Sequence, residues 1–229
     1  MNYEISNFSC NGYVILENVF NKNELIEIKN QIKTYVKNNK CYMNGGGISI
    51  VDFVNIDELS NIGEIRNNKT IQNALKEIFK NKNYRFVGHN DIGINRIVGW
   101  HKDKLNGEYA KYETLDIWSK TEDGKEHNIL KVLIYLEDHN NDNYGLKLVP
   151  KSHLVSSINP EGYININSRC GDVVIFDQRI THRGMEKYPP NRFQEPRILV
   201  SFGFGEDDNV FTDNFELGTF KRQEKQKVK

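Results

Sequence analysis

From Tyr84 onward, the sequence consists of short apolar runs, rich in β-branched residues, that are separated by turn-forming residues. Runs of this length and composition are typical of the strands of β-sandwiches and jelly rolls. We expect strands near residues 84–88, 92–98, 130–136, 146–150, 172–177 and 197–204. The sequence therefore predicts a mainly β fold.

The first third of the chain has a different pattern. Apolar residues within 25–36 recur every three or four positions, which is the spacing of one helix face. Asn21 can cap this helix, and Glu24 completes the sequence signature of a capping box. A second amphipathic helix is expected around residues 71–79. We expect both helices to pack on one sheet of the β fold.

The domain organisation follows from the apolar pattern. A short buried strand is expected at residues 12–16, and no second apolar core is evident along the chain. We therefore predict a single domain over residues 1–220. Residues 221–229 are mostly Lys, Arg and Gln, and we expect a disordered basic tail there.

Composition excludes several classes of protein. Thirty-one basic and 31 acidic residues give a net charge of zero, which argues against general nucleic-acid binding. The chain has no run of 18 apolar residues and no basic–apolar leader, so we expect neither a membrane span nor a secretory signal. The three cysteines are scattered and are expected to be free thiols. These features favour a cytoplasmic protein; they leave its oligomeric state open.

His101 and Asp103 form the most informative pair of polar residues. Side chains at positions i and i+2 of an extended segment point the same way, so an imidazole and a carboxylate can meet at one point. These are two of the three ligands in a 2-His-1-carboxylate triad, which holds Fe(II) and leaves coordination positions open. Because His-x-Asp is also common by chance, the chain must supply a second histidine.

His182 has the most suitable surroundings for that role, because it follows the strongly apolar strand expected at 172–177. His89 and His139 lie in turn-like segments, where solvent exposure is the default expectation. The remaining histidines are His127, in a polar stretch, and His153.

Arg197 begins the strand expected at 197–204, and alternation puts Ser201 on the same face. An arginine there can present its planar fork to a carboxylate, and the serine can add a hydroxyl group. An exposed arginine at a strand end is an equal alternative. Tyr135 and Lys131 share one face of another strand, where they either contact a cosubstrate or simply pack. Residues 104–128 form a lid or a surface elaboration.

The ordered set of these segments resembles the phytanoyl-CoA dioxygenase (PhyH) family of Fe(II)/2-oxoglutarate-dependent oxygenases. Each segment is loosely defined, but their order along nearly the whole chain is specific. The matching segments are residues 12–16, His101-Lys102-Asp103, residues 145–153, Gly171-Asp172, Phe176-Asp177, His182-Arg183-Gly184 and Pro196-Arg197.

The resemblance implies a double-stranded β-helix, the jelly roll shared with cupins. It implies that His101, Asp103 and His182 bind Fe(II) as the catalytic centre and that Arg197 binds the distal carboxylate of the cosubstrate 2-oxoglutarate. Ser201 and Tyr135 are the further candidates for cosubstrate contacts, and O2 is the co-reactant.

Two positions depart from the family pattern. Lys151 stands where the family usually has glycine, which should alter only a turn. Arg197 lies 15 residues after His182, a long gap for the family, and this leaves Arg192 as a rival anchor. His153 is expected to be structural.

The predicted function is hydroxylation of an unidentified, polar small molecule. Asp103 supports this prediction, because related halogenases replace the carboxylate ligand with a small residue. Two alternatives remain from sequence alone: a cupin-like metalloenzyme that does not use 2-oxoglutarate, and a non-catalytic barrel that only binds a ligand.

Overall fold

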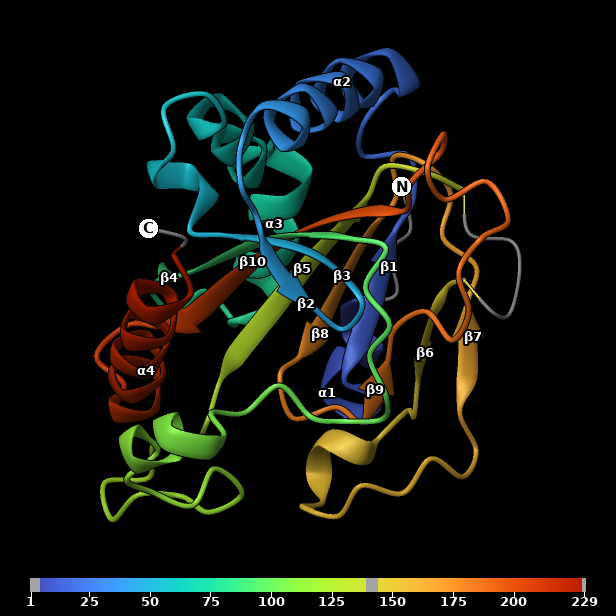
Figure 1. Ribbon diagram of the computed structural model, residues 1–229. Helices are drawn as coiled ribbons and strands as arrows, with labels where there is room; N and C mark the ends of the chain where they lie inside the picture. The colour runs from blue at the N-terminus through green and yellow to red at the C-terminus, as the bar shows by residue number, and fades with distance from the viewer. Residues whose placement is uncertain (1–4, 139–143, 228–229) are drawn as a thin grey trace.

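The computed structural model describes residues 5–138 and 144–227, which form two antiparallel sheets flanked by helices (Figure 1). The large sheet has seven strands in the order β1-β8-β5-β10-β4-β3-β2, and the small sheet has three in the order β7-β6-β9. The large-sheet strands are β1 (Tyr13–Leu16), β2 (Tyr42–Asn44), β3 (Gly47–Val51), β4 (Tyr84–Ile94), β5 (Ile129–Tyr135), β8 (Val173–Asp177) and β10 (Ile198–Glu206). The small sheet contains β6 (Leu146–Leu148), β7 (Ile164–Ile166) and β9 (His182–Arg183).

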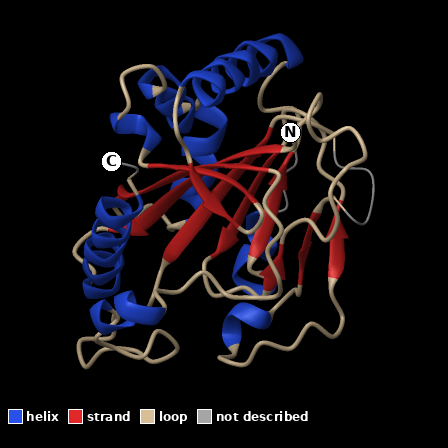
Figure 2. Cartoon of the chain, viewed as in Figure 1, coloured by secondary structure: helices blue, strands red, loops and turns tan. Residues whose placement is uncertain are grey.

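The helices of the N-terminal part cover one face of the large sheet, and the C-terminal helix packs against its inner strand β4 (Figure 2). The α-helices are α1 (Phe8–Asn11), α2 (Lys22–Asn38), α3 (Lys69–Ile78) and α4 (Val210–Gln226). Short 3-10 helices are η1 (Ile5–Asn7), η2 (Phe53–Asn55), η3 (Ser60–Asn67), η4 (Gly107–Tyr112) and η5 (Ser152–Leu154). Leu25 and Ile32 of α2 and Leu75 of α3 are buried in one core with Val132 and Val200 of the central strands. The two expected N-terminal helices therefore pack on the large sheet.

The opposite face of the large sheet faces the small sheet. Leu133, Val174 and Phe176 from the large sheet form a second apolar cluster with Leu146 and Leu148 from β6. Burying apolar surface from both sheets fixes their separation and leaves a polar cavity beside this cluster.

Asn21 caps α2 as the sequence predicts. Its side chain accepts a hydrogen bond from the Glu24 amide at 3.0 Å, and the Glu24 carboxylate accepts one from the Asn21 amide at 2.9 Å. We expect Asn21→Ala to lower the free energy of unfolding by about 1 kcal/mol, because the Glu24 amide at the helix start loses its side-chain acceptor. Urea unfolding monitored by circular dichroism measures this difference, and an unchanged midpoint would contradict it.

Three predictions about the fold need correction. Helical residues outnumber strand residues, so the fold is mixed α/β with large antiparallel sheets, and "mainly β" is too narrow. The strands expected at 84–88 and 92–98 are one strand, β4, which ends at Ile94. Its polar centre resembled a turn in sequence; in the structure Asn90 is buried and accepts a hydrogen bond from the Val54 amide at 3.0 Å.

The third correction concerns the C-terminus. Residues 221–226, predicted to begin a disordered tail, form the last turns of α4. Their basic side chains find acidic partners: Arg222 pairs with Asp91 and Lys225 with Glu108. Pairing of this kind removes the charge repulsion on which the prediction of disorder rested. The prediction of one domain over 1–220 stays a prediction.

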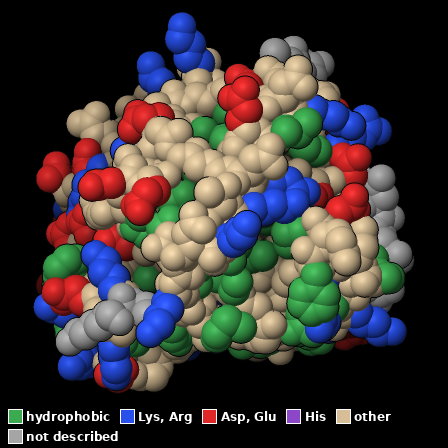
Figure 3. Space-filling model, turned by 45° about the horizontal axis from the view of Figure 1, so that its top comes forward, with side chains coloured by type: hydrophobic (Ala, Val, Ile, Leu, Met, Phe, Trp, Pro, Cys, Tyr) green, Lys and Arg blue, Asp and Glu red, His purple; other side chains and the backbone are tan. Residues whose placement is uncertain are grey.

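The surface carries charges of both signs. On the face shown in Figure 3, Lys and Arg side chains are interspersed with Asp and Glu, and hydrophobic side chains lie between them. Within the described part of the chain, no helix is long and apolar enough to cross a membrane.

Candidate metal and cosubstrate site

The cavity between the two sheets has a volume of about 460 Å³. Alternating side chains of β4, β5 and β10 form its floor, and these strands are in register. Asp91 lies opposite Ser201, which lies opposite Leu133; the next row contains Gly93, Leu199 and Tyr135. The floor therefore has a fixed spacing set by the hydrogen bonds of the sheet.

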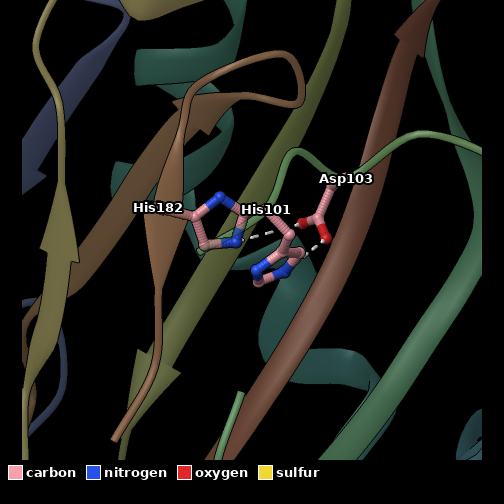
Figure 4. Close-up of side chains that lie close together, drawn as sticks. All are labelled: His101, Asp103 and His182. Atoms are coloured by element: carbon pink, nitrogen blue, oxygen red, sulfur yellow. Dashed lines mark ion pairs between the residues drawn. The ribbon is translucent and has the colours of Figure 1, made fainter. Parts of the chain in front are cut away.

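His101, Asp103 and His182 meet at one side of this cavity (Figure 4). His182 lies on β9, and His101 is held beside it because their backbones exchange two 2.9 Å hydrogen bonds. The Asp103 carboxylate lies 3.4 Å from Nε2 of His101 and 3.7 Å from Nε2 of His182. One potential ligand atom from each residue lies within 4.8 Å of the others, a spacing suited to one metal ion.

Backbone carbonyl groups orient both imidazole rings. Nδ1 of His101 lies 2.8 Å from the Gly99 carbonyl oxygen, and Nδ1 of His182 lies 3.0 Å from the Ile180 carbonyl oxygen. A carbonyl oxygen can only accept, so each Nδ1 carries the proton and each Nε2 keeps its lone pair toward Asp103. This is the arrangement that metal-binding histidines adopt.

The charge states of two of the three groups also suit a divalent cation. Burial and the neighbouring His101 lower the pKa of His182 to about 4, so its ring is neutral at pH 7. Burial would raise the pKa of Asp103, but Lys131, His182 and His101 hold it well below its usual value. Burial would lower the pKa of His101, yet its contact with Asp103 raises it overall. Metal binding at this site would therefore compete with a proton on His101.

The three candidate cosubstrate residues line the same cavity. The guanidinium group of Arg197 lies over the ring of Tyr135 at 5.1 Å, and the Ser201 hydroxyl donates to the Asp91 carbonyl at 3.1 Å. Arg197 is buried, its Nε has no hydrogen-bond acceptor, and no carboxylate within the described residues forms an ion pair with it. The rival Arg192 does not line the cavity; its guanidinium lies 4.0 Å from the Tyr188 ring centroid.

A buried polar network that the sequence did not reveal lies next to the three ligands. Lys131 Nζ is 3.2 Å from Asp103 Oδ2 and 2.7 Å from Nε2 of His89. Arg222 of α4 binds both carboxylate oxygens of Asp91, at 3.1 and 3.3 Å. His89 is thus buried, contrary to the expected exposure, because β4 continues through its polar centre. The i and i+2 spacing of His89 and Asp91 was the sequence signal that could have indicated a shared strand face.

The stretch 104–128 contributes only its beginning to the cavity. Lys104, Leu105, Asn106 and Tyr109 line it, whereas the rest continues away from the cavity. Glu108 pairs with Lys225 of α4 at 2.5 Å. The segment is thus joined to the helix that closes one side of the cavity, and it is more than a surface elaboration.

The remaining histidines lie outside the cavity or outside the described residues. His127 is buried at 4% exposure, and burial lowers its pKa to about 4. His153 is buried against Gly12, with Nε2 3.2 Å from the Ser9 carbonyl oxygen, as a structural histidine would be. His139 lies outside the described residues.

Residues 8–187 match the family profile described as "Phytanoyl-CoA dioxygenase (PhyH)". No curated protein sequence matches the chain significantly.

Several solved structures share the fold at low sequence identity. HygX from Streptomyces hygroscopicus, solved with nickel and 2-oxoglutarate, gives a TM-score of 0.67 at 12% identity, over 89% of this chain and 86% of that one. The epimerase SnoN from nogalamycin biosynthesis, solved with Fe3+, alpha ketoglutarate and nogalamycin RO, gives 0.65 at 14% identity, over 88% and 82%. The carbocyclase SnoK from the same biosynthesis gives 0.65 at 15% identity, over 89% and 83%.

Proposed function

Because the chain belongs to the phytanoyl-CoA dioxygenase (PhyH) family, we propose that it is an Fe(II)/2-oxoglutarate-dependent oxygenase built on a double-stranded β-helix. The observation that carries the proposal is the convergence of two imidazoles and one carboxylate in a cavity that also contains a buried guanidinium group without a carboxylate partner in the described chain. The two imidazoles and the carboxylate suit Fe(II), and the guanidinium group suits one carboxylate of a diacid.

His101, Asp103 and His182 would hold the iron. Their fit rests on the free Nε2 lone pairs, the low pKa of Asp103 and the mutual spacing of the ligand atoms. When bound together, iron and 2-oxoglutarate would allow O2 to act as the oxidant: one oxygen atom oxidises 2-oxoglutarate to succinate and carbon dioxide, and the other oxidises the substrate. The protein contributes by fixing the ligands on one side and leaving the other side of the metal position open to the cavity.

Arg197 would bind the distal carboxylate of 2-oxoglutarate. Its backbone is fixed just before β10, since the Arg197 amide donates to Asn95 Oδ1 at 2.9 Å. Tyr135 lies against its guanidinium group, which limits the side chain's freedom before the diacid arrives. Ser201 lies four residues further along the chain on β10 and lines the same cavity; its hydroxyl would donate to the cosubstrate by turning away from the Asp91 carbonyl.

The reaction that we propose is hydroxylation of a polar small molecule. Asp103 fills the ligand position that a halide takes when the carboxylate is replaced by a small residue, and polar side chains make up much of the cavity wall. An epimerase and a carbocyclase are among the structural neighbours, so the fold is compatible with several oxidative outcomes.

The test is a ferrous titration of the purified protein without oxygen. We expect a weak visible charge-transfer band when both Fe(II) and 2-oxoglutarate are added, and we expect succinate to form once O2 is admitted. Succinate has to be measured with and without a panel of candidate metabolites, since the true substrate accelerates its formation. A wild-type protein that gives neither the band nor succinate would refute the proposed function.

A further inference from the structure

The cavity carries more positive charge than the proposed chemistry requires. Among the described residues, two carboxylates line it, those of Asp91 and Asp103, together with five cationic side chains. The cations are Arg96, Lys104, Lys131, Arg197 and Arg222. A divalent metal and a 2-oxoglutarate dianion cancel each other in charge, so the loaded site keeps the same positive excess.

Most of these cations already have an assignment. Lys131 contacts Asp103 and His89, and Arg222 is bound to Asp91 through both carboxylate oxygens. Lys104 is exposed to solvent at the rim. Arg197 is the proposed anchor of the cosubstrate. Arg96 is therefore the one cation of the described cavity lining that is inside it and still lacks a role.

The backbone places Arg96 firmly over the cavity floor. Asn95 takes a left-handed conformation, with φ of 51°, and ends β4. Its amide donates to the Arg197 carbonyl, and its side chain accepts from the Arg197 amide, each at 2.9 Å. Arg96 then folds back above Gly93, where a Cβ atom would come within 3.2 Å of Arg96 Cδ. Gly93 thus provides the space in which the arginine stem lies.

Within the described part of the chain, Arg96 forms no ion pair. Its Nε is buried without a hydrogen-bond acceptor, and no ion pair joins its guanidinium group to any carboxylate of the described residues. Burial lowers the pKa of Arg96, and so do the nearby charges of Arg222 and Arg197; Asp91 and Asp103 offset this lowering only in part. A guanidinium group that is partly desolvated and unpaired is costly, and an anion that enters the cavity would remove this cost.

We infer that Arg96 binds an anionic group of the substrate, a carboxylate or a phosphate, while Arg197 binds the cosubstrate; this inference rests on the proposed function. The planar fork of arginine matches either oxyanion through two parallel hydrogen bonds. The β2–β3 turn runs beside Arg96, because the Ile97 amide donates to the Gly45 carbonyl at 2.9 Å. Tyr42 and Asn44 from this hairpin line the cavity and complete the polar wall for the neutral part of the substrate.

The experiment uses the protein loaded with Mn(II) and 2-oxoglutarate, so that the cosubstrate position is filled. Benzoate, phenylphosphonate and neutral benzyl alcohol are titrated separately, and the broadening of their ring protons by Mn(II) reports binding inside the cavity. We expect one or both anions to be broadened and benzyl alcohol to be unaffected. Whether benzoate or phenylphosphonate binds better tells a carboxylate substrate from a phosphate substrate.

Arg96→Gln should weaken anion binding by about ten-fold or more, as expected for the loss of charge-assisted hydrogen bonds. Arg192→Gln is the matched control, because that guanidinium lies on Tyr188 and Phe193 outside the cavity. Equal anion broadening in Arg96→Gln and wild type, equal broadening by benzyl alcohol, or no anion broadening in wild type would each overturn the inference. So would a loss of 2-oxoglutarate affinity in Arg96→Gln that exceeds the loss in Arg197→Gln, since Arg96 would then be the cosubstrate anchor.

The failure of this inference can be told from the failure of the proposed function. The Fe(II)–2-oxoglutarate band of the wild-type protein does not depend on a substrate anion. If the band forms and the anions behave identically in wild type and Arg96→Gln, only the inference is wrong. If the wild-type band is absent, the proposed function is wrong, and the substrate assignment of Arg96 falls with it.

Discussion

His182→Ala and Asp103→Ala should each abolish the Fe(II)–2-oxoglutarate band and lower the affinity for Fe(II) by more than about a hundred-fold. Mutating a residue that only orients a metal ligand typically lowers metal affinity by about 10–100-fold, so removing a ligand itself should lower it more. Asp103 also supplies the negative charge that offsets the metal, since its carboxylate is the only acidic group within the proposed ligand set. Anaerobic titration monitored in the visible range, together with equilibrium dialysis of Mn(II), measures both losses.

Folding has to be checked separately, because Asp103 also pairs with Lys131 at 3.2 Å. Asp103→Asn keeps the size of the side chain and most of its packing but removes the charge, and it should lose metal affinity like the alanine variant. Asp116→Ala is a matched control: this carboxylate is exposed, lies outside the cavity and accepts from Ser119 at 2.7 Å. A band that persists in both Asp103 variants, with native circular dichroism, would mean that the metal binds elsewhere.

The local periodicity of the chain was sufficient to predict much of the fold. Helix α2 was predictable because its capping residues and its apolar face are adjacent in sequence. Strand β5 was predictable because all seven of its residues are buried, and its sequence is an apolar run interrupted only by Lys131. Strand β4 was not, because its Asn90 and Asp91 are made tolerable only by partners from Val54 and Arg222. Those partners lie at a distance along the chain that no local pattern encodes.

The candidate site also contains some residues that a local pattern reveals and others that depend on distant partners. His101 and Asp103 could be paired by local spacing, and His182 by its place after an apolar strand. The family resemblance predicted that the three residues form one site, and in the structure one potential ligand atom from each lies within 4.8 Å of the others. Arg222 could not be found, because its helix appeared to be a polar tail with no apolar stripe. Its contact with Asp91 depends on how α4 packs against β4, which is a tertiary property.

Arg197 and Arg192 are the two candidate anchors of the cosubstrate, and substituting the correct one should strongly lower the affinity for 2-oxoglutarate. The two residues are close in sequence, but only Arg197 is buried and lines the cavity. Removing the guanidinium group from a buried pair with a carboxylate costs more than removing it from an exposed pair, because the carboxylate left behind is desolvated and unpaired. The two arginines thus form an internal comparison with one chemistry and two levels of burial.

Arg197→Gln should weaken 2-oxoglutarate binding by about 100-fold, since truncating one partner of a buried charge pair costs about 2–5 kcal/mol. Arg197→Lys should restore only part of the affinity, because an ammonium group cannot form two parallel hydrogen bonds with one carboxylate. Arg192→Gln should bind 2-oxoglutarate like the wild type. Titration of the charge-transfer band with 2-oxoglutarate at saturating Fe(II) gives all three affinities, and Fe(II) affinity measured without cosubstrate should be the same in all of them. An Arg197→Gln variant with wild-type affinity for 2-oxoglutarate would show that another group binds the distal carboxylate, because a desolvated carboxylate cannot lose its guanidinium partner without a large cost in free energy.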